Sequence, residues 1–87
     1  MQNTTVYKSE IVRHETRTYP KHRHSPARTV VVWSETCESG LHSVHWRLTL
    51  HGANGAGGGG CCGEMEPSEA ALKVESLLKG LAGRTDS

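Results

Sequence analysis

The stretch that decides the fold reads V-H-W-R-L-T-L-H over residues 44–51. Apolar and polar side chains alternate along it without a break, the apolar ones being Val44, Trp46, Leu48 and Leu50. A repeat of two residues is typical of a β-strand that packs one face on a core and leaves the other in water. We therefore expect a strand over about residues 43–51, with His45 and Arg47 on its wet face.

Two further strands are expected upstream. Residues 29–33 read T-V-V-V-W, a continuous apolar run that predicts a strand over about residues 29–34. The loop of residues 34–41 is short enough to join it to the strand at 43–51 as an antiparallel hairpin. β-Branched and aromatic residues predict a first strand over about residues 4–16, bulged because its alternation slips between Val6/Tyr7 and Ile11/Val12. This strand can pair beside either of the other two.

The segment that follows is dominated by glycine. Seven of the twelve residues 52–63 are glycine, read from G-A-N-G-A-G-G-G-G-C-C-G. The backbone entropy of glycine opposes regular structure. We therefore predict a flexible linker over residues 52–63.

A C-terminal helix is predicted over about residues 67–82. Pro67 suits the first helical position, Glu69 favours the positive end of the helix dipole, and Gly83 is a natural stop. The apolar positions recur at helical spacing and are Ala71, Val74, Leu78 and Leu81, widened by Ala70 and Leu77. This stripe should pack on the apolar face of the strand at 43–51.

These elements predict an α+β fold in a single small domain of residues 1–87. A three-stranded antiparallel sheet is packed on one face by one C-terminal helix, in the order β-β-β-α. The second strand is apolar on both sides, with Val30 and Val32 on one face and Val31 and Trp33 on the other. Because one helix cannot cover both faces, we expect a homodimer partner or another macromolecule to cover the second.

Charge is unevenly placed along the chain. Residues 1–33 hold six Lys and Arg against two Glu, a balance of 6 − 2 = +4, whereas residues 34–87 hold four against seven Asp and Glu, 4 − 7 = −3. Such asymmetry can steer association, so we predict that basic side chains contact the partner. The candidate partner-binding residues are Arg13, Arg17, Lys21, Arg23 and Arg28 in the basic segment 13–28, with Arg47 on the exposed strand face.

The same basic segment leaves nucleic-acid binding open as an alternative. Tyr19 lies within it, and a basic patch with an aromatic side chain can hold a phosphate backbone and a base. The sequence pI is about 7.8, whereas nucleic-acid-binding domains usually exceed about 9. A protein partner is therefore the first expectation.

The three cysteines, Cys37, Cys61 and Cys62, do not suggest a disulfide framework, because their number is odd and two are adjacent. With a polar N-terminus that predicts no signal peptide, they indicate free thiols in the reducing cytoplasm. A zinc-stabilised module using Cys37, His42 or His45, Cys61 and Cys62 is a second alternative. The C-x4-H-x2-H spacing is unusual for zinc, and His42 and His45 should point to opposite faces of a strand, so we predict no metal and no cofactor.

No set of residues predicts catalysis. Cys37 lies between Glu35 and Glu38, and neighbouring carboxylates disfavour the thiolate that a nucleophile needs. Residues 55–60 match G-x-G-x-x-G, but a dinucleotide site needs a parallel βαβ unit that the predicted fold lacks. No run of about 20 apolar residues predicts a membrane span. We therefore expect neither an enzyme nor a membrane protein.

Residues 44–50, the glycine linker and the helix containing Ala70-Ala71-Leu72 together resemble, in layout, small phage-encoded inhibitor proteins, including the anti-CRISPR proteins. This resemblance implies a non-catalytic protein that occludes a protein or ribonucleoprotein complex of a host defence system. It implies no shared functional residues. We therefore predict a small cytoplasmic binding protein that acts by occupying the surface of a partner macromolecule.

Overall fold

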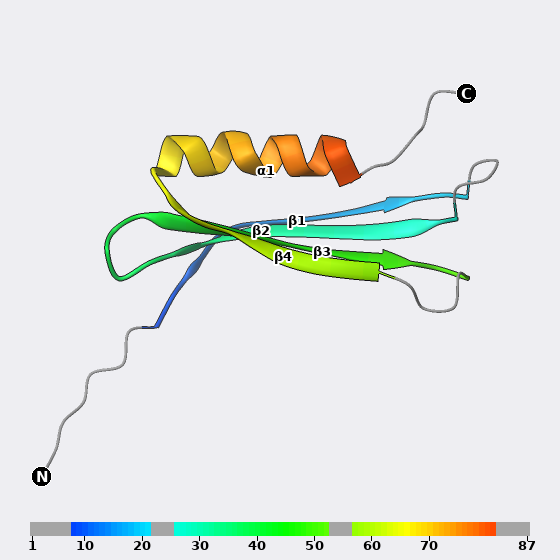
Figure 1. Ribbon diagram of the computed structural model, residues 1–87, viewed down its shortest axis with the longest axis horizontal. Helices are drawn as coiled ribbons and strands as arrows, with labels where there is room; N and C mark the ends of the chain where they lie inside the picture. Colours follow the sequence, from blue (N-terminus) through cyan, green and yellow to red (C-terminus); the bar gives the residue numbers. More distant parts are fainter. Residues whose placement is uncertain (1–7, 22–25, 53–56, 82–87) are drawn as a thin grey trace, which may run out of the picture.

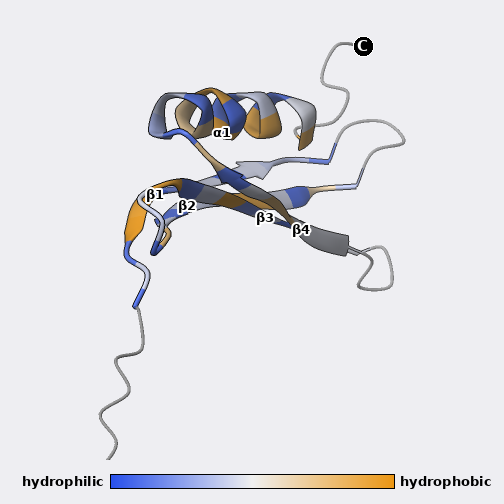
Figure 2. Cartoon of the chain, turned by 60° about the vertical axis from the view of Figure 1, so that its left-hand side comes forward, coloured by the Kyte–Doolittle hydropathy of each residue, from blue (hydrophilic) through white to orange (hydrophobic). Residues whose placement is uncertain are grey.

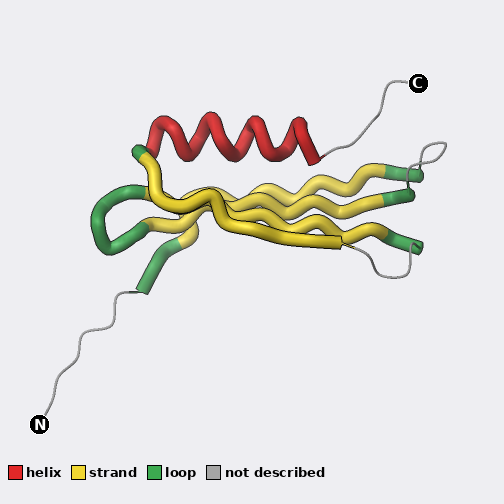
Figure 3. The backbone as a smooth tube through the Cα atoms, viewed as in Figure 1, coloured by secondary structure: helices red, strands yellow, loops and turns green. Residues whose placement is uncertain are grey.

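The computed structural model describes residues 8–21, 26–52 and 57–81. These ranges form the strands β1 (Ile11–Tyr19), β2 (Arg28–Thr36), β3 (His42–Leu50) and β4 (Gly57–Met65) and the helix α1 (Pro67–Leu81) (Figure 1). The strands lie in one sheet, and α1 runs along one face of it (Figure 3). The predicted α+β fold with an antiparallel sheet and a C-terminal helix is confirmed. Within the described ranges, no helix is both long enough and apolar enough to cross a membrane.

The sheet is a meander in the order β1-β2-β3-β4, and every neighbouring pair is antiparallel. The turn between β2 and β3 is closed by the Cys37 N–H, which donates to the Leu41 carbonyl oxygen at 2.8 Å. β1 begins and ends later than the predicted strand of residues 4–16, because the residues that pair with β2 are Ile11 and residues 13–19. Residues 4–7 of that prediction lie outside the described ranges. The register of β1 on β2 shifts between Ile11 and Arg13, so the strand is bulged.

The core lies between α1 and the sheet, chiefly over β2 and β3. Its buried apolar side chains are Val30, Val32 and Val44 of the strands and Ala70, Val74 and Leu78 of α1. Hydrophobic and hydrophilic residues both occur along these elements (Figure 2). At the start of the helix, Ala70 is buried and Ala71 is exposed, because the buried positions follow an i, i+4, i+8 row.

The predicted three-stranded sheet is wrong, because the glycine tract predicted as a flexible linker over residues 52–63 contributes the fourth strand, β4. The indole of Trp46 gives the physical reason. A Cβ added to Gly60 would lie 2.9 Å from Trp46 Nε1, and one added to Gly58 would lie 3.9 Å from Trp46 Cη2. The ring therefore lies over both glycines and occupies the space that a Cβ at Gly60 would need. Its packing against the core helps to offset the backbone entropy that opposes a glycine strand.

β4 is bulged near its C-terminal end. Its register on β3 shifts between Ser43 and His45, and Gly63 adopts a φ of 80°, which favours glycine. Beyond the bulge, Met65 pairs with His42 and packs against the core. The bulge thus bends the chain toward the helix side just before α1 begins.

Candidate functional site

The face of the sheet opposite α1 is covered by no element of the described ranges (Figure 1). Residues directly opposite one another in an antiparallel sheet share a face, so the strand register assigns the side chains of this open face. The open face consists of Ile11, His14, Thr16 and Thr18 of β1, Thr29, Val31, Trp33 and Glu35 of β2, Ser43, His45, Arg47 and Thr49 of β3, and Gly57, Gly59, Cys61 and Glu64 of β4. Val31 and Trp33 point away from the helix, as their alternation with Val30 and Val32 predicts.

Three aromatic rings form a row across the open face. Trp33 lies between His14 and His45, with ring centroids 6.5 Å and 5.3 Å away. The planes of Trp33 and His45 differ by only 12°, so these rings stack. Because neighbours hold the indole from both sides, Trp33 is only partly exposed although no described layer covers it. The centre of the open face is therefore ordered before any partner binds.

Glu35 fixes the indole within this row. Its carboxylate accepts hydrogen bonds from Trp33 Nε1 at 2.6 Å and from Ser9 Oγ at 2.8 Å. His45 Nε2 lies 3.9 Å from Glu35 Oε2 and 2.9 Å from Ser43 Oγ. The hydrogen bonds from Ser9 and Trp33, helped by the charge that His45 carries when protonated, outweigh partial burial and hold the pKa of Glu35 below its ordinary value.

Glu35→Gln is expected to reduce the loss of stability at acid pH. A carboxyl whose pKa is depressed in the folded protein binds its proton more readily in the unfolded chain. Its stabilising contribution is therefore complete above the ordinary pKa of 4.5 and is lost as the pH falls through the lower folded value. Urea midpoints measured at about pH 7 and about pH 3.5 should differ less for the variant than for the wild type.

Part of this pH dependence should remain in Glu35→Gln, because Arg13 also lowers the pKa of Glu75. An equal fall in the urea midpoint of both proteins would show that Ser9 and Trp33 do not hold Glu35 ionised.

The basic residues predicted to contact a partner do not form one patch. The register places three of them on the helix side of the sheet and one on the open face. Those on the helix side are Arg13, Arg17 and Arg28. Arg47 is exposed on the open face, and Lys21 is exposed just beyond β1. Arg23 lies outside the described ranges.

Two of the helix-side arginines are engaged with carboxylates. Arg13 Nε lies 3.1 Å from Glu15 Oε2, and its guanidinium also pairs with Glu75 of α1. Arg17 Nη2 lies 3.5 Å from Glu15 Oε1. Glu75 is 62 positions from Arg13 in the sequence, so this partner could not be read from a local pattern. These pairs connect β1 to the flank of α1 and occupy charges that a partner would otherwise meet.

The zinc alternative is not supported by the placement of its residues. His42 shares the helix side with Met65, whereas His45 and Cys61 face each other on the open face. Cys62 packs instead against the core cluster. Across residues 8–21, 26–52 and 57–81, no group of three or more His, Cys, Asp or Glu is placed to hold a metal ion.

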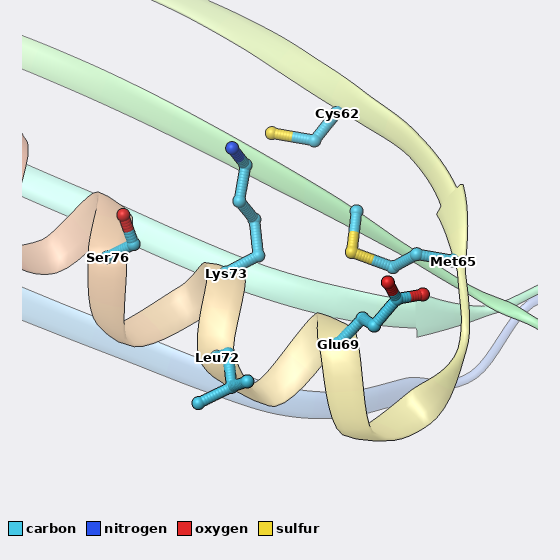
Figure 4. A pocket seen from close by; sticks show the side chains of 6 residues that line it. All are labelled: Cys62, Met65, Glu69, Leu72, Lys73 and Ser76. Carbon is cyan, nitrogen blue, oxygen red and sulfur yellow. The ribbon is translucent and has the colours of Figure 1, made fainter.

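An open groove lies on the helix side, between β4 and α1 (Figure 4). Its lining consists of Cys62, Met65, Glu69, Leu72, Lys73 and Ser76. Sequence reasoning missed it, because a linker over residues 52–63 gives no reason to place Cys62 beside the helix.

Comparison of the chain with protein-family models, with curated proteins and with solved structures finds no match. The function must therefore be inferred from the chemistry of the open face.

Proposed function

We propose that this protein is a small, non-catalytic binding protein that docks its open face on a partner macromolecule and occludes the surface it covers. The row of rings centred on Trp33 carries the proposal. A sheet face that meets only water usually carries polar side chains, whereas Val31 and Trp33 lie at the middle of this one. Contact with a partner would remove these apolar side chains from water, which explains their place on this face.

The surroundings of the ring row support a macromolecular interface. Trp and Arg are the residue types that most often dominate binding energy, and Trp33 and Arg47 share the open face. The stack with His14 and His45 already restricts Trp33, so little side-chain entropy remains to be lost on binding. The threonines of β1, β2 and β3 supply hydroxyl groups around this centre, as a polar rim requires.

The layout resemblance supports a partner class. On that basis the proposal extends to a phage-encoded, anti-CRISPR-like inhibitor whose partner is a cytoplasmic protein or ribonucleoprotein complex of host defence. Occlusion needs only a complementary surface, which a chain of 87 residues can supply.

Nucleic-acid binding is a second candidate, favoured by Arg47. This residue is exposed on the open face directly opposite Val31 and beside the row of rings. A cation next to aromatic rings can hold a phosphate while a base stacks on a ring. The basic segment contributes less than its composition suggests, because Arg13 and Arg17 are paired with carboxylates on the helix side.

A matched pair of charge reversals tests the open face. Arg47→Glu changes an exposed residue of that face, and Lys73→Glu makes the same change on an exposed position of α1. Tagged wild type, both variants and Trp33→Ala are incubated with lysate of the native host, and captured molecules are quantified by mass spectrometry. Capture should fall about 30-fold with Trp33→Ala, the loss expected for a hot-spot residue, and should fall with Arg47→Glu but not with Lys73→Glu.

Two controls complete this experiment. Far-UV circular dichroism checks that each variant is folded. Nuclease treatment separates the candidates: capture that survives it supports a protein partner, and capture that needs nucleic acid and disappears between about 50 and 200 mM salt supports the second candidate. Equal capture by all four proteins would contradict the open face as the binding surface.

A further inference from the structure

β4 forms an outer edge of the sheet that no described element covers (Figure 1). In an antiparallel ladder, successive residues point their backbone groups to one side and then to the other. The His51 N–H, directly after β3, donates to the carbonyl oxygen of Ala27, directly before β2. The backbone groups of odd-numbered residues in β3 therefore hydrogen-bond to β2, and those of even-numbered residues hydrogen-bond to β4. Because Trp46 is opposite Gly60, the even-numbered residues of β4 bond inward. The residues whose backbone groups point outward are Gly57, Gly59 and Cys61.

The two edges of the sheet differ in their protection. β1 carries Arg13, Glu15 and Arg17 and is bulged at its start. Charged side chains and bulges are the usual means by which an edge avoids pairing with another strand. Residues 57–62 of β4 carry no charge and no proline. This edge is therefore the one built to accept a strand.

We propose that this edge binds a second copy of the chain, joined as an antiparallel β4–β4 pair across a two-fold axis. β4 consists of glycine over residues 57–60, and the larger Cys61 and Cys62 follow directly. Antiparallel pairing centred on Gly60 places Cys61 of each copy opposite Gly59 of the other, and Cys62 opposite Gly58. Large side chains thus meet small ones, and no like charges meet within residues 57–62. Such self-complementarity is what a two-fold interface requires.

Trp46 gives this pair an apolar contact on the helix side. Its indole extends over β4, where a Cβ on Gly60 would approach Nε1 and a Cβ on Gly58 would approach Cη2. Neighbouring strands lie about 4.8 Å apart, so the indoles of the two copies would meet over the central pair of strands. The groove lined by Met65 and Leu72 lies on the same side, next to this contact.

The dimer would join two four-stranded sheets into one continuous sheet. The two open faces would then lie side by side and remain uncovered. The pairing therefore does not depend on the proposed function, and either can fail without the other.

Matched proline variants test the pairing. Cys61→Pro removes an N–H of β4 that points away from the sheet. Thr16→Pro removes the equivalent N–H of β1: Glu15, opposite Val32, hydrogen-bonds to β2, so the backbone groups of the next residue, Thr16, point outward. Sedimentation equilibrium is measured in reductant, so that no disulfide contributes. Wild type and Thr16→Pro should approach twice the monomer mass of 9.5 kDa as concentration rises, whereas Cys61→Pro should stay at 9.5 kDa.

Three outcomes would overturn the proposal. They are a wild type that stays at 9.5 kDa at every concentration, a folded Cys61→Pro that still dimerises, and a dimer lost with Thr16→Pro alone. If Cys61→Pro does not fold, amide hydrogen exchange of the wild type decides. The amides of Gly58 and Gly60 should be protected at low and high concentration, whereas those of Gly59 and Cys61 should gain protection only at high concentration. Without that gain, the pairing does not occur.

Discussion

Val74→Asp is expected to leave the protein unfolded. Val74 is 0% exposed and belongs to a buried cluster of hydrophobic side chains only. An unpaired carboxylate there costs at least about 3–5 kcal/mol, whereas a domain of this size is stable by only about 3–5 kcal/mol. Far-UV circular dichroism should show the loss of sheet and helix, and urea titration should show no cooperative transition.

Leu72→Asp is the matched control, because it makes the same kind of change two positions earlier on α1. Leu72 is 72% exposed, so its replacement should alter the free energy of unfolding by no more than about 0.5 kcal/mol. A cooperatively folded Val74→Asp would mean that α1 does not pack on the sheet through Ala70, Val74 and Leu78.

Gly60→Ala is expected to have the second largest effect, a loss of about 1–3 kcal/mol of unfolding free energy. Alanine usually favours strand structure over glycine, because it restricts the unfolded chain. Here the added Cβ would lie 2.9 Å from Trp46 Nε1, so the indole must move away from the core side chains it packs on. Urea unfolding monitored by circular dichroism measures the loss.

Gly58→Ala provides the comparison within the same strand and on the same face. Its Cβ would lie 3.9 Å from Trp46 Cη2, an ordinary contact. We expect stability to be unchanged or raised by up to about 1 kcal/mol. Equal effects of the two substitutions would contradict the placement of Trp46 over Gly60.

The elements that follow from the sequence are those with a local period. The alternation at residues 44–51 marks β3, and the helical spacing of Val74 and Leu78 marks α1. β4 has no such period. Its glycines oppose a strand when considered alone. The feature that explains Gly60, the Trp46 indole, lies on a neighbouring strand. A tryptophan beside a glycine tract was the available signal, but only the register shows that Trp46 and Gly60 face each other.

Some features of the candidate site likewise follow from a local sequence pattern, and others do not. Alternation along β2 is enough to place Val31 and Trp33 on the face away from the helix. The stacking of Trp33 with His14 and His45 depends on the register of three strands, which no local pattern sets. The net charge of the basic segment likewise says nothing about which arginines meet a carboxylate. A charge count therefore suggested one basic surface where the sheet places basic residues on both faces.

The central claim is that residues 57–65 form a strand beneath Trp46. The extent of the open face and the position of the β4 edge both depend on this strand. Nuclear Overhauser contacts between the Trp46 ring protons and the Hα protons of Gly58 and Gly60 measure it most directly. We predict strong contacts to both glycines and a ring-current shift of the Gly60 Hα signals. Random-coil shifts for Gly57 to Gly60, without contacts to Trp46, would contradict the fourth strand and the β4–β4 pairing that rests on its position.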